Sequence, residues 1–210
     1  GCSPKEVIGE RRQFGKVFVL QNQYESSERS IQRAAKDQYG LVLDLPTCIQ
    51  CKDVWRVSHP KWVDMWRALN RGAIVATHNP GRVYRVGRVA FCHDGTHLRL
   101  KLPCERLLTF PFAQVVRRQT PWGTEQDGVQ FYGIVKHQWV TCDATGGHLF
   151  NACVQSIGAS LMRYAAKNID IAGFPVVLRL HAHDHDPGPV RFERGQDPVN
   201  RGHCIGRPNL

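Results

Sequence analysis

The first third of the chain has the periodicity of helices. Apolar side chains recur at intervals of three and four residues between residues 4 and 36, and the polar segment Tyr24–Ser27 predicts a break. A second helical stretch is predicted between residues 36 and 77, interrupted by a turn at Leu45–Thr47. Its large side chains fall on one helical stripe, which is typical of a core: Val54, Trp55, Trp62, Met65, Trp66 and Leu69.

The pattern becomes that of β-strands after Asn79–Gly81. Short apolar and β-branched runs are bounded by glycine, proline and aspartate, which favour turns. Strands are predicted at residues 83–91, 98–102 and 107–110 and, after a polar loop at 121–130, between residues 130 and 141. A long helix is predicted at about 148–168, and a short buried strand at 176–184 follows Gly173 and Pro175.

These elements together predict an α+β fold. We expect a helical region at residues 1–79, a mixed region with an antiparallel sheet at residues 80–189, and an irregular tail at residues 190–210. The tail is rich in arginine, glycine and proline and has no apolar periodicity. We therefore expect no packed element there, and disorder is compatible with its composition.

Charge narrows the class of partner. The 210 residues carry a formal net charge of +10. Such an excess favours a polyanionic partner, with nucleic acid before an anionic membrane surface. No apolar run is long enough to span a membrane, and the first residues lack the apolar core of a signal peptide. We therefore expect no membrane association through a spanning helix, and a cytoplasmic location.

The last predicted strand ends in a cluster of ionisable side chains. Alternation along the strand places His181, His183 and His185 on one face and Asp184 and Asp186 on the other. Carboxylates at the end of a buried strand are suited to hold a divalent metal. Two alternatives stay open. One is a solvated polar turn. The other is a metal-dependent hydrolase, whose H-x-H-x-D-H pattern the segment approaches with its last two residues exchanged.

Cysteine spacing gives a weaker indication of metal binding. Cys48-Ile-Gln-Cys51 has the spacing of a zinc-binding pair, and His59 follows it. No second pair follows at the spacing of a zinc finger, so the sequence leaves zinc binding at Cys48 and Cys51 open.

One helix face near the start combines positive charge with apolar and aromatic side chains. Arg12, Lys16, Leu20 and Tyr24 are spaced four apart and therefore lie along one face of a helix. The two cations are suited to phosphate groups, and the other two side chains are suited to pack on a base and a sugar. The alternative is an ordinary solvated basic face.

Two blocks that carry these residues resemble motifs of one family. Arg12-Gln-Phe-Gly-Lys16, followed after seven residues by Tyr24, resembles the fingers-helix motif R-x-x-x-K-x(7)-Y-G of family A DNA polymerases of the bacteriophage kind. His183-Asp184 is similar to the family's palm motif V-H-D-E, in which the aspartate is a metal ligand.

Two further blocks stand between them in the family's order. Residues 98–110 are similar to L-x-I-x-L-P-S-G-R-x-L-x-Y, and residues 146–155 are similar to G-G-K-L-V-E-N-I-V-Q. Each block alone is weak, whereas four blocks in order and at similar spacing are specific. The resemblance extends over residues 4–186 and implies polymerase fingers helices followed by a palm sheet.

The resemblance implies a role for each matching residue of the fingers helix. Arg12 and Lys16 would bind the triphosphate of the incoming nucleotide, and Lys16 would also take part in catalysis. Leu20 stands near the sugar, where the family usually has an aromatic residue. Tyr24 would pack against the templating base pair.

The remaining motifs imply contacts with DNA and metal. Arg106 and Gln155 would hold primer or template, and Asn151 stands where bacterial relatives carry an asparagine. His183 would contact the primer terminus as a catalytic residue. Catalytic Mg²⁺ would be bound by Asp184, with Asp186 as the alternative register. The implied activity is DNA-directed DNA polymerisation in DNA replication by two-metal nucleotidyl transfer, with primer–template DNA and dNTP as partners. For a phage-encoded chain the location would be the host cytoplasm.

The chain also departs from the family. The D-Y-S-x-I-E strand that carries the first metal carboxylate has no match among residues 1–11. Glu25 and Glu105 stand where the patterns have glycine, and the last motif reads His-Asp-His rather than His-Asp-Glu. We therefore expect this stretch alone to polymerise negligibly. It would be the C-terminal piece of a split or truncated polymerase that works with an N-terminal fragment, or a non-catalytic DNA-binding remnant.

Overall fold

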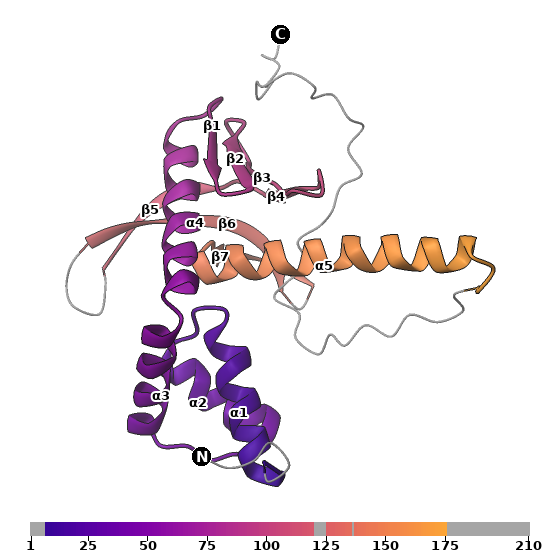
Figure 1. Ribbon diagram of the computed structural model, residues 1–210. Helices are drawn as coiled ribbons and strands as arrows, with labels where there is room; N and C mark the ends of the chain where they lie inside the picture. Colours follow the sequence, from indigo (N-terminus) through magenta and orange to yellow (C-terminus); the bar gives the residue numbers. More distant parts are fainter. Residues whose placement is uncertain (1–6, 120–124, 136, 176–210) are drawn as a thin grey trace. The chain divides into compact units, whose positions relative to one another are not determined.

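The computed structural model describes residues 7–119, 125–135 and 137–175. These residues form five helices and two antiparallel sheets, so the predicted α+β class is confirmed (Figure 1). The chain divides into two compact units. Of the described residues, the first unit comprises those up to Ala68 together with Gly146–Phe150, and the second comprises those between Leu69 and Thr145 and those from Asn151 to residue 175. The strand predicted at 176–184 and the tail predicted at 190–210 lie outside the described residues.

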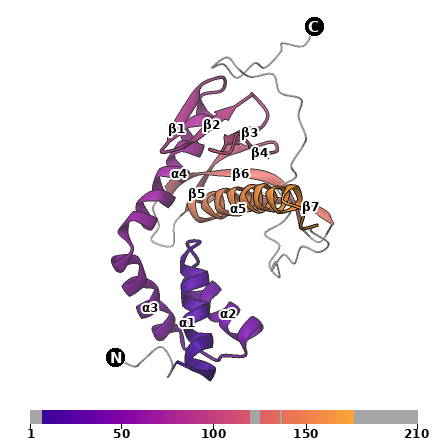
Figure 2. The ribbon, with the colours of Figure 1, turned by 45° about the vertical axis from the view of Figure 1, so that its right-hand side comes forward.

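Three helices of the first unit lie side by side (Figures 1 and 2). They pack around a small apolar core. They are α1 (Gly9–Asn22), α2 (Glu28–Tyr39) and α3 (Leu45–Ser58). The predicted break between the first two is confirmed, because Ser27 caps α2 by accepting the Ser30 N–H at 3.3 Å. The buried core consists of Val17, Phe18, Ile31, Ala35 and Cys48.

The turn predicted at Leu45–Thr47 is wrong, since these residues form the first turn of α3. The Asp44 carboxylate accepts the Thr47 N–H at 3.2 Å, and Pro46 fits a first turn because its missing N–H has no helical partner there. A proline read as a helix interruption is here part of a helix start. The sequence Asp-Leu-Pro-Thr therefore specifies a capped N-terminus.

The next helix, α4 (Pro60–His78), belongs to both units. Trp66 is 2% exposed, and Trp55 stacks on it with ring centroids 5.8 Å apart. Leu69 is also buried, but Val54 is 60% exposed. The aromatic stripe predicted from the sequence is therefore core only in part.

Four strands form the first sheet of the second unit, in chain order (Figure 2). They are β1 (Val83–Val86), β2 (Val89–His93), β3 (Leu98–Lys101) and β4 (Leu107–Phe110). The single strand predicted at 83–91 is wrong, because Gly87 and Arg88 form a two-residue turn. Only Gly87 of the two has a positive φ, +57°, which fits a type II′ turn with glycine first.

One face of this sheet is buried over β3, β4 and part of β2. Strand alternation puts five large side chains on that face, each 0% exposed: Phe91, Leu98, Leu100, Leu108 and Phe110. Helix α4 lies against it at Gly72, where an added Cβ would lie 2.7 Å from Val86 Cγ2 and 3.0 Å from Phe91 Cδ2. The helix and the sheet therefore approach at van der Waals distance.

The second sheet contains β5 (Gln114–Gln119), β6 (Glu125–Val135) and β7 (Gln138–Asp143). The polar loop predicted at 121–130 is wrong from Glu125 onward, because β6 begins there. Two of its acidic residues pair with Arg117 across the ladder, Glu125 at 3.4 Å and Asp127 at 3.9 Å. Phe131 packs edge to face on Phe110 at 5.1 Å, so the two sheets share a core.

The last described helix, α5 (Gly146–Ile171), confirms the helix predicted at about 148–168 and extends it at both ends. It also contributes to both units. Leu149, Cys153 and Ser156 are its most deeply buried residues. None of the helices in the described ranges is apolar over a length that would let it cross a membrane.

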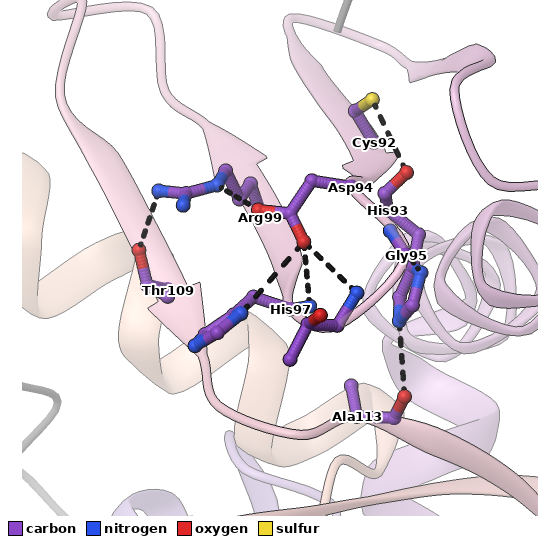
Figure 3. A network of polar contacts seen from close by, with 9 residues as sticks. Cys92, His93, Asp94, Gly95, His97, Arg99, Thr109 and Ala113 are labelled. Atoms are coloured by element: carbon purple, nitrogen blue, oxygen red, sulfur yellow. Dashed lines mark hydrogen bonds and ion pairs between the residues drawn. The ribbon is translucent and has the colours of Figure 1, made fainter. Parts of the chain in front are cut away.

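A polar network holds the turn between β2 and β3 (Figure 3). The Asp94 carboxylate accepts the His97 N–H at 2.7 Å and the Arg99 Nε–H at 2.7 Å. Arg99 also reaches the Thr109 hydroxyl on β4 at 3.4 Å. One carboxylate thus connects the turn to two strands.

His93 completes this network from the buried face of the sheet. Its Nδ1 accepts the Gly95 N–H at 3.1 Å, and its Nε2 lies 3.0 Å from the Ala113 carbonyl oxygen (Figure 3). A carbonyl can only accept, so Nε2 is the donor in this contact.

Asp94 should make the stability of the second unit depend on pH. Burial raises the pKa of its carboxyl, but hydrogen bonds from His97, Arg99 and Thr96 outweigh burial and the pKa is lowered. The stabilisation is present above the unfolded-state pKa of 3.8 and is lost as pH falls through the lower folded-state value. We expect Asp94→Asn to destabilise by about 1–3 kcal/mol near neutral pH, and by less near about pH 3.

Urea unfolding of both proteins at the two pH values measures this difference. Asp64→Asn is the control, because Asp64 is 74% exposed and its pair with Arg67 is 3.8 Å long; its effect should stay within about 0.5 kcal/mol. If the free energies of unfolding of Asp94→Asn and the unaltered protein differ by the same amount at both pH values, the predicted pH dependence is wrong.

Candidate functional site

The predicted cationic row lies along the surface of α1. Arg12, Lys16 and Leu20 are all exposed, and Leu20 keeps 46% of its surface accessible. Neither cation has an ion-pair partner within the described part of the chain. Their charges are therefore available to an anionic ligand.

A shallow, open hollow lies beside this row. Its almost entirely apolar lining comes from five residues: Gly15, Lys16, Val19, Leu20 and Tyr39. A cation at the edge of an apolar wall suits a ligand with one anionic and one apolar part. Sequence reasoning missed Tyr39, because it comes from the end of α2 and no spacing rule connects it to α1.

Tyr24 follows the last turn of α1 and is half-buried. Its ring lies 6.5 Å from the ring of Phe150, measured between centroids. Phe150 in turn packs edge to face on Trp62 at 5.0 Å. The ring predicted to face a base pair thus has aromatic neighbours within the first unit.

Glu25, the next residue, has the left-handed backbone conformation that favours glycine, with φ of +63°. Its carboxylate accepts the Gly147 N–H at 2.7 Å. That N–H belongs to the first turn of α5, where amide groups lack helical partners and negative charge is favourable. The side chain therefore offsets part of the backbone cost by capping α5. The glycine of the family motif is the only signal in the sequence for this position.

Two glycines at the start of α5 are required by close packing. A Cβ on Gly146 would lie 2.2 Å from the Trp66 carbonyl oxygen, and one on Gly147 would lie 2.1 Å from the Tyr24 carbonyl oxygen. Backbone atoms cannot move aside as a flexible side chain can. Any residue other than glycine at position 146 or 147 would therefore overlap a backbone carbonyl oxygen.

The turn between β3 and β4 holds a second glutamate with positive φ. Glu105 has φ of +62° and points to solvent, with 76% of its side chain exposed. Its carboxylate lies 2.5 Å from Lys101 Nζ. Glu105 takes the position of the glycine in the family's P-S-G-R turn.

Arg106, at the end of that turn, contacts the middle of α5. Its Nη1 donates to the Ser156 carbonyl at 3.3 Å, and Ser160 Oγ lies 3.5 Å from Cys104 Sγ one helical turn further. Gln155 is the residue before Ser156. The structure thus brings the segments of Arg106 and Gln155, two predicted DNA contacts, together in the second unit.

Asn151 lies one helical turn before Gln155 on the same helix. Its side-chain carbonyl oxygen is buried and has no hydrogen-bond partner among the residues described here. A buried acceptor without a partner is costly, and such groups often serve a ligand or a water molecule.

The predicted metal site is not in the described part of the chain. His183, Asp184 and Asp186 all lie beyond residue 175. Within the described ranges, no group of three or more histidine, cysteine, aspartate or glutamate side chains is placed to hold a metal. Magnesium binding therefore stays a prediction, and no step is derived from it.

Cys48 and Cys51 are free thiols at the core of the first unit. Burial is the main cause that raises the pKa of both thiols. Zinc binds the thiolate, so this environment opposes the ligand form that the CxxC spacing suggested.

The two left-handed glutamates should respond differently to glycine. Glu105→Gly should stabilise the protein by about 0.5–1 kcal/mol, because relief of about 1–2 kcal/mol of backbone strain exceeds the entropy that glycine adds to the unfolded chain. Glu25→Gly gains the same relief but loses the cap on α5, so it should be less favourable than Glu105→Gly by about 1–2 kcal/mol. Urea unfolding of both variants and of Glu25→Ala, which keeps the strain and loses the cap, checks the order. Equal effects of the two glycine substitutions would contradict the capping role of Glu25.

Gly147→Ala should be strongly destabilising, by about 3 kcal/mol or more, because its methyl group overlaps a backbone carbonyl. Gly158→Ala is the matched control, since it lies in the same helix with nothing within 4 Å of an added Cβ. It should be neutral or stabilising by up to about 1 kcal/mol. Thermal unfolding of the two variants compares them directly, and similar melting temperatures would refute the close approach.

Comparison with known proteins adds no relative. No protein-family model, no curated protein and no solved structure matches this chain.

Proposed function

We propose that this chain binds primer–template DNA and a nucleoside triphosphate as part of a DNA-directed DNA polymerase related to family A of bacteriophages. The observation that carries the proposal concerns glycine. At each of three places where the family patterns have glycine, the backbone here either has a positive φ or leaves no room for a Cβ. Glycine is the residue that suits both conditions best.

Two of the three places hold glutamate. Glu25 follows the motif tyrosine and Glu105 precedes the motif arginine, and both have φ near +60°. Positive φ is uncommon outside glycine, and among the described non-glycine residues it occurs elsewhere only at Phe112 and His137. At both positions glutamate stands where the family patterns have glycine, and the backbone has the conformation that glycine favours.

The third place retains its glycines. Gly146-Gly147 opens the block that resembles G-G-K-L-V-E-N-I-V-Q, and neither residue has room for a Cβ. Amino-acid composition gives no reason why positive φ, or a lack of room for a Cβ, should occur at the positions where the motifs have glycine. These backbone conditions therefore support kinship in three separate blocks.

The surface of α1 supports a nucleotide-binding role. Arg12 and Lys16 are exposed and unpaired in the described part of the molecule, and the hollow beside them is apolar. A triphosphate requires cations in water-accessible positions, and a nucleoside requires an apolar surface. The row therefore offers both parts of such a site on one helix.

The turn of Arg106 supports a contact with DNA. Arg106 donates to the carbonyl of Ser156, the residue after Gln155 on α5, so the segments of two predicted DNA contacts about fifty residues apart lie together. The net charge of +10 favours the same polyanionic partner. Asp184, with Asp186 as the alternative register, would hold the magnesium of the family reaction, which would supply charge stabilisation for nucleotidyl transfer. Such a protein would act in the cytoplasm.

The proposal predicts nucleotide-dependent binding of DNA. A chain-terminated primer annealed to a template should bind about tenfold more tightly, or better, when Mg²⁺ and the complementary dNTP are added, because both ligands share one complex. Arg12→Gln and Lys16→Gln should each remove most of that increase. Arg11→Gln, an exposed arginine about 100° around the same helix, should keep it. Fluorescence anisotropy with labelled DNA measures all four proteins.

Other outcomes identify the alternatives. Binding that is strongly salt-dependent but unchanged by nucleotide indicates a DNA-binding module without chemistry and contradicts the nucleotide site. Stoichiometric zinc in the purified protein, found by elemental analysis, would instead support a metal-dependent hydrolase. Equal losses for Arg11→Gln and Arg12→Gln would show a general effect of charge rather than a site.

A further inference from the structure

The hairpin formed by β1 and β2 carries three exposed arginines. Arg82 precedes β1, Arg85 lies within it, and Arg88 is at the tip of the turn. None of the three has an ion-pair partner in the part of the chain that the structure describes. Positive charge is therefore concentrated on a short edge hairpin.

The surrounding sequence contains no compensating charge. Residues 65–93 include five arginines and neither aspartate nor glutamate. Across the ladder, Arg85 faces Ala90, which is uncharged. Like charges gathered without counter-charges repel one another, so a polyanion binding here would relieve that repulsion as well as add contacts.

Other cations on the same sheet behave differently. Arg99 lies 2.7 Å from Asp94, and Lys101 lies 2.5 Å from Glu105. These two are paired within the sheet. The unpaired state of the hairpin arginines is therefore a local property and not a general feature of this sheet.

The hairpin is firmly anchored beneath these arginines. Val86 packs on α4 at Gly72, with its Cγ2 only 2.7 Å from the place of an added Cβ. Phe91, opposite Tyr84, is 0% exposed. The arginines therefore extend from a rigid base, which lowers the entropy that a ligand must offset on binding.

The spacing of these charges fits the backbone of a duplex. Residues advance by about 3.3 Å along a strand, so the backbones of Arg82 and Arg85 lie about 10 Å apart. Phosphates of one DNA strand follow each other at about 3.4 Å along the helix axis. Cations about 10 Å apart can therefore contact different phosphates of one duplex.

We propose that Arg82, Arg85 and Arg88 form a contact surface for the phosphate backbone of duplex DNA. The inference rests on the proposed function and adds a surface that none of its motif residues includes. The alternative is that these charges only protect β1, an edge strand, from pairing with a second copy of the chain.

The test compares two triple variants with the unaltered chain. Arg82→Gln, Arg85→Gln and Arg88→Gln are combined in one protein, and Arg29→Gln, Arg33→Gln and Lys36→Gln, exposed positions of α2, in the other. Both lose three positive charges. Affinity for a labelled primer–template duplex is measured by anisotropy at several salt concentrations.

We expect the hairpin variant to bind at least about tenfold more weakly at about 0.1 M salt. Its slope of log K against log salt should be smaller by about 2.7, because three phosphate contacts contribute about 0.9 each. The α2 variant should keep a slope close to that of the unaltered chain. Circular dichroism of both variants shows whether they fold. If the hairpin triple variant does not fold, Arg88→Gln alone should lower the slope by about 0.9.

Three results would overturn the inference. Equal losses in both variants would show that net charge alone decides affinity. An unchanged slope in the hairpin variant, with DNA binding by the unaltered chain intact, would refute the hairpin surface and leave the proposed function standing; self-association of that variant would then assign the arginines to edge protection. No binding of duplex by the unaltered chain would refute the proposed function as well.

Discussion

The approach of the α5 backbone to two carbonyl groups is the constraint on which the first unit depends. Gly146 meets the carbonyl of Trp66 and Gly147 meets that of Tyr24, and a methyl group at either place would overlap an oxygen atom. Three further contacts become possible only at this distance. They are the hydrogen bond from Gly147 to Glu25, the packing of Tyr24 on Phe150, and that of Trp62 on Phe150. The C-terminal end of α1, the helix that carries Arg12 and Lys16, is thus held by residues that come far later in the chain.

Much of the secondary structure could be predicted from periodicity, and the errors have local causes. Apolar residues in the helical regions recur every three to four positions, a period that strands do not have. Ser27 marks the break between two of the helices. The hairpin at Gly87-Arg88 was missed, because apolar residues on both sides of a two-residue turn look like one continuous strand. The start of β6 was missed, because Glu125 and Asp127 look like a loop until their partners on β5 are known. Cross-strand pairing is not visible in a single segment.

The candidate site, too, could be predicted from the sequence only in part. The positions of Arg12, Lys16 and Leu20 on one exposed face follow from spacing alone, since a helix fixes which residues are neighbours. Tyr39 beside them depends on how α2 packs against α1, which no local rule gives. The conformations of Glu25 and Glu105 could be expected only from the glycines of a motif, because nothing in the chemistry of glutamate favours positive φ. Burial raises the cysteine pKa at Cys48 and Cys51, and this too depends on packing.

The first unit is interrupted in the sequence by most of the second, and this has a consequence for synthesis. The hydrogen bond between Glu25 and Gly147 spans 122 residues, whereas the ladders of β1 to β4 join neighbouring segments. A chain leaving the ribosome from its N-terminus can form the local sheet as soon as those strands emerge. The three N-terminal helices can pack around their own core earlier, but the contacts of Tyr24 and Trp66 with α5 form only after residues 146–150 have been translated. During that interval the surface around Trp66 lacks its final cover, and transiently exposed apolar surface is what makes folding intermediates prone to aggregate.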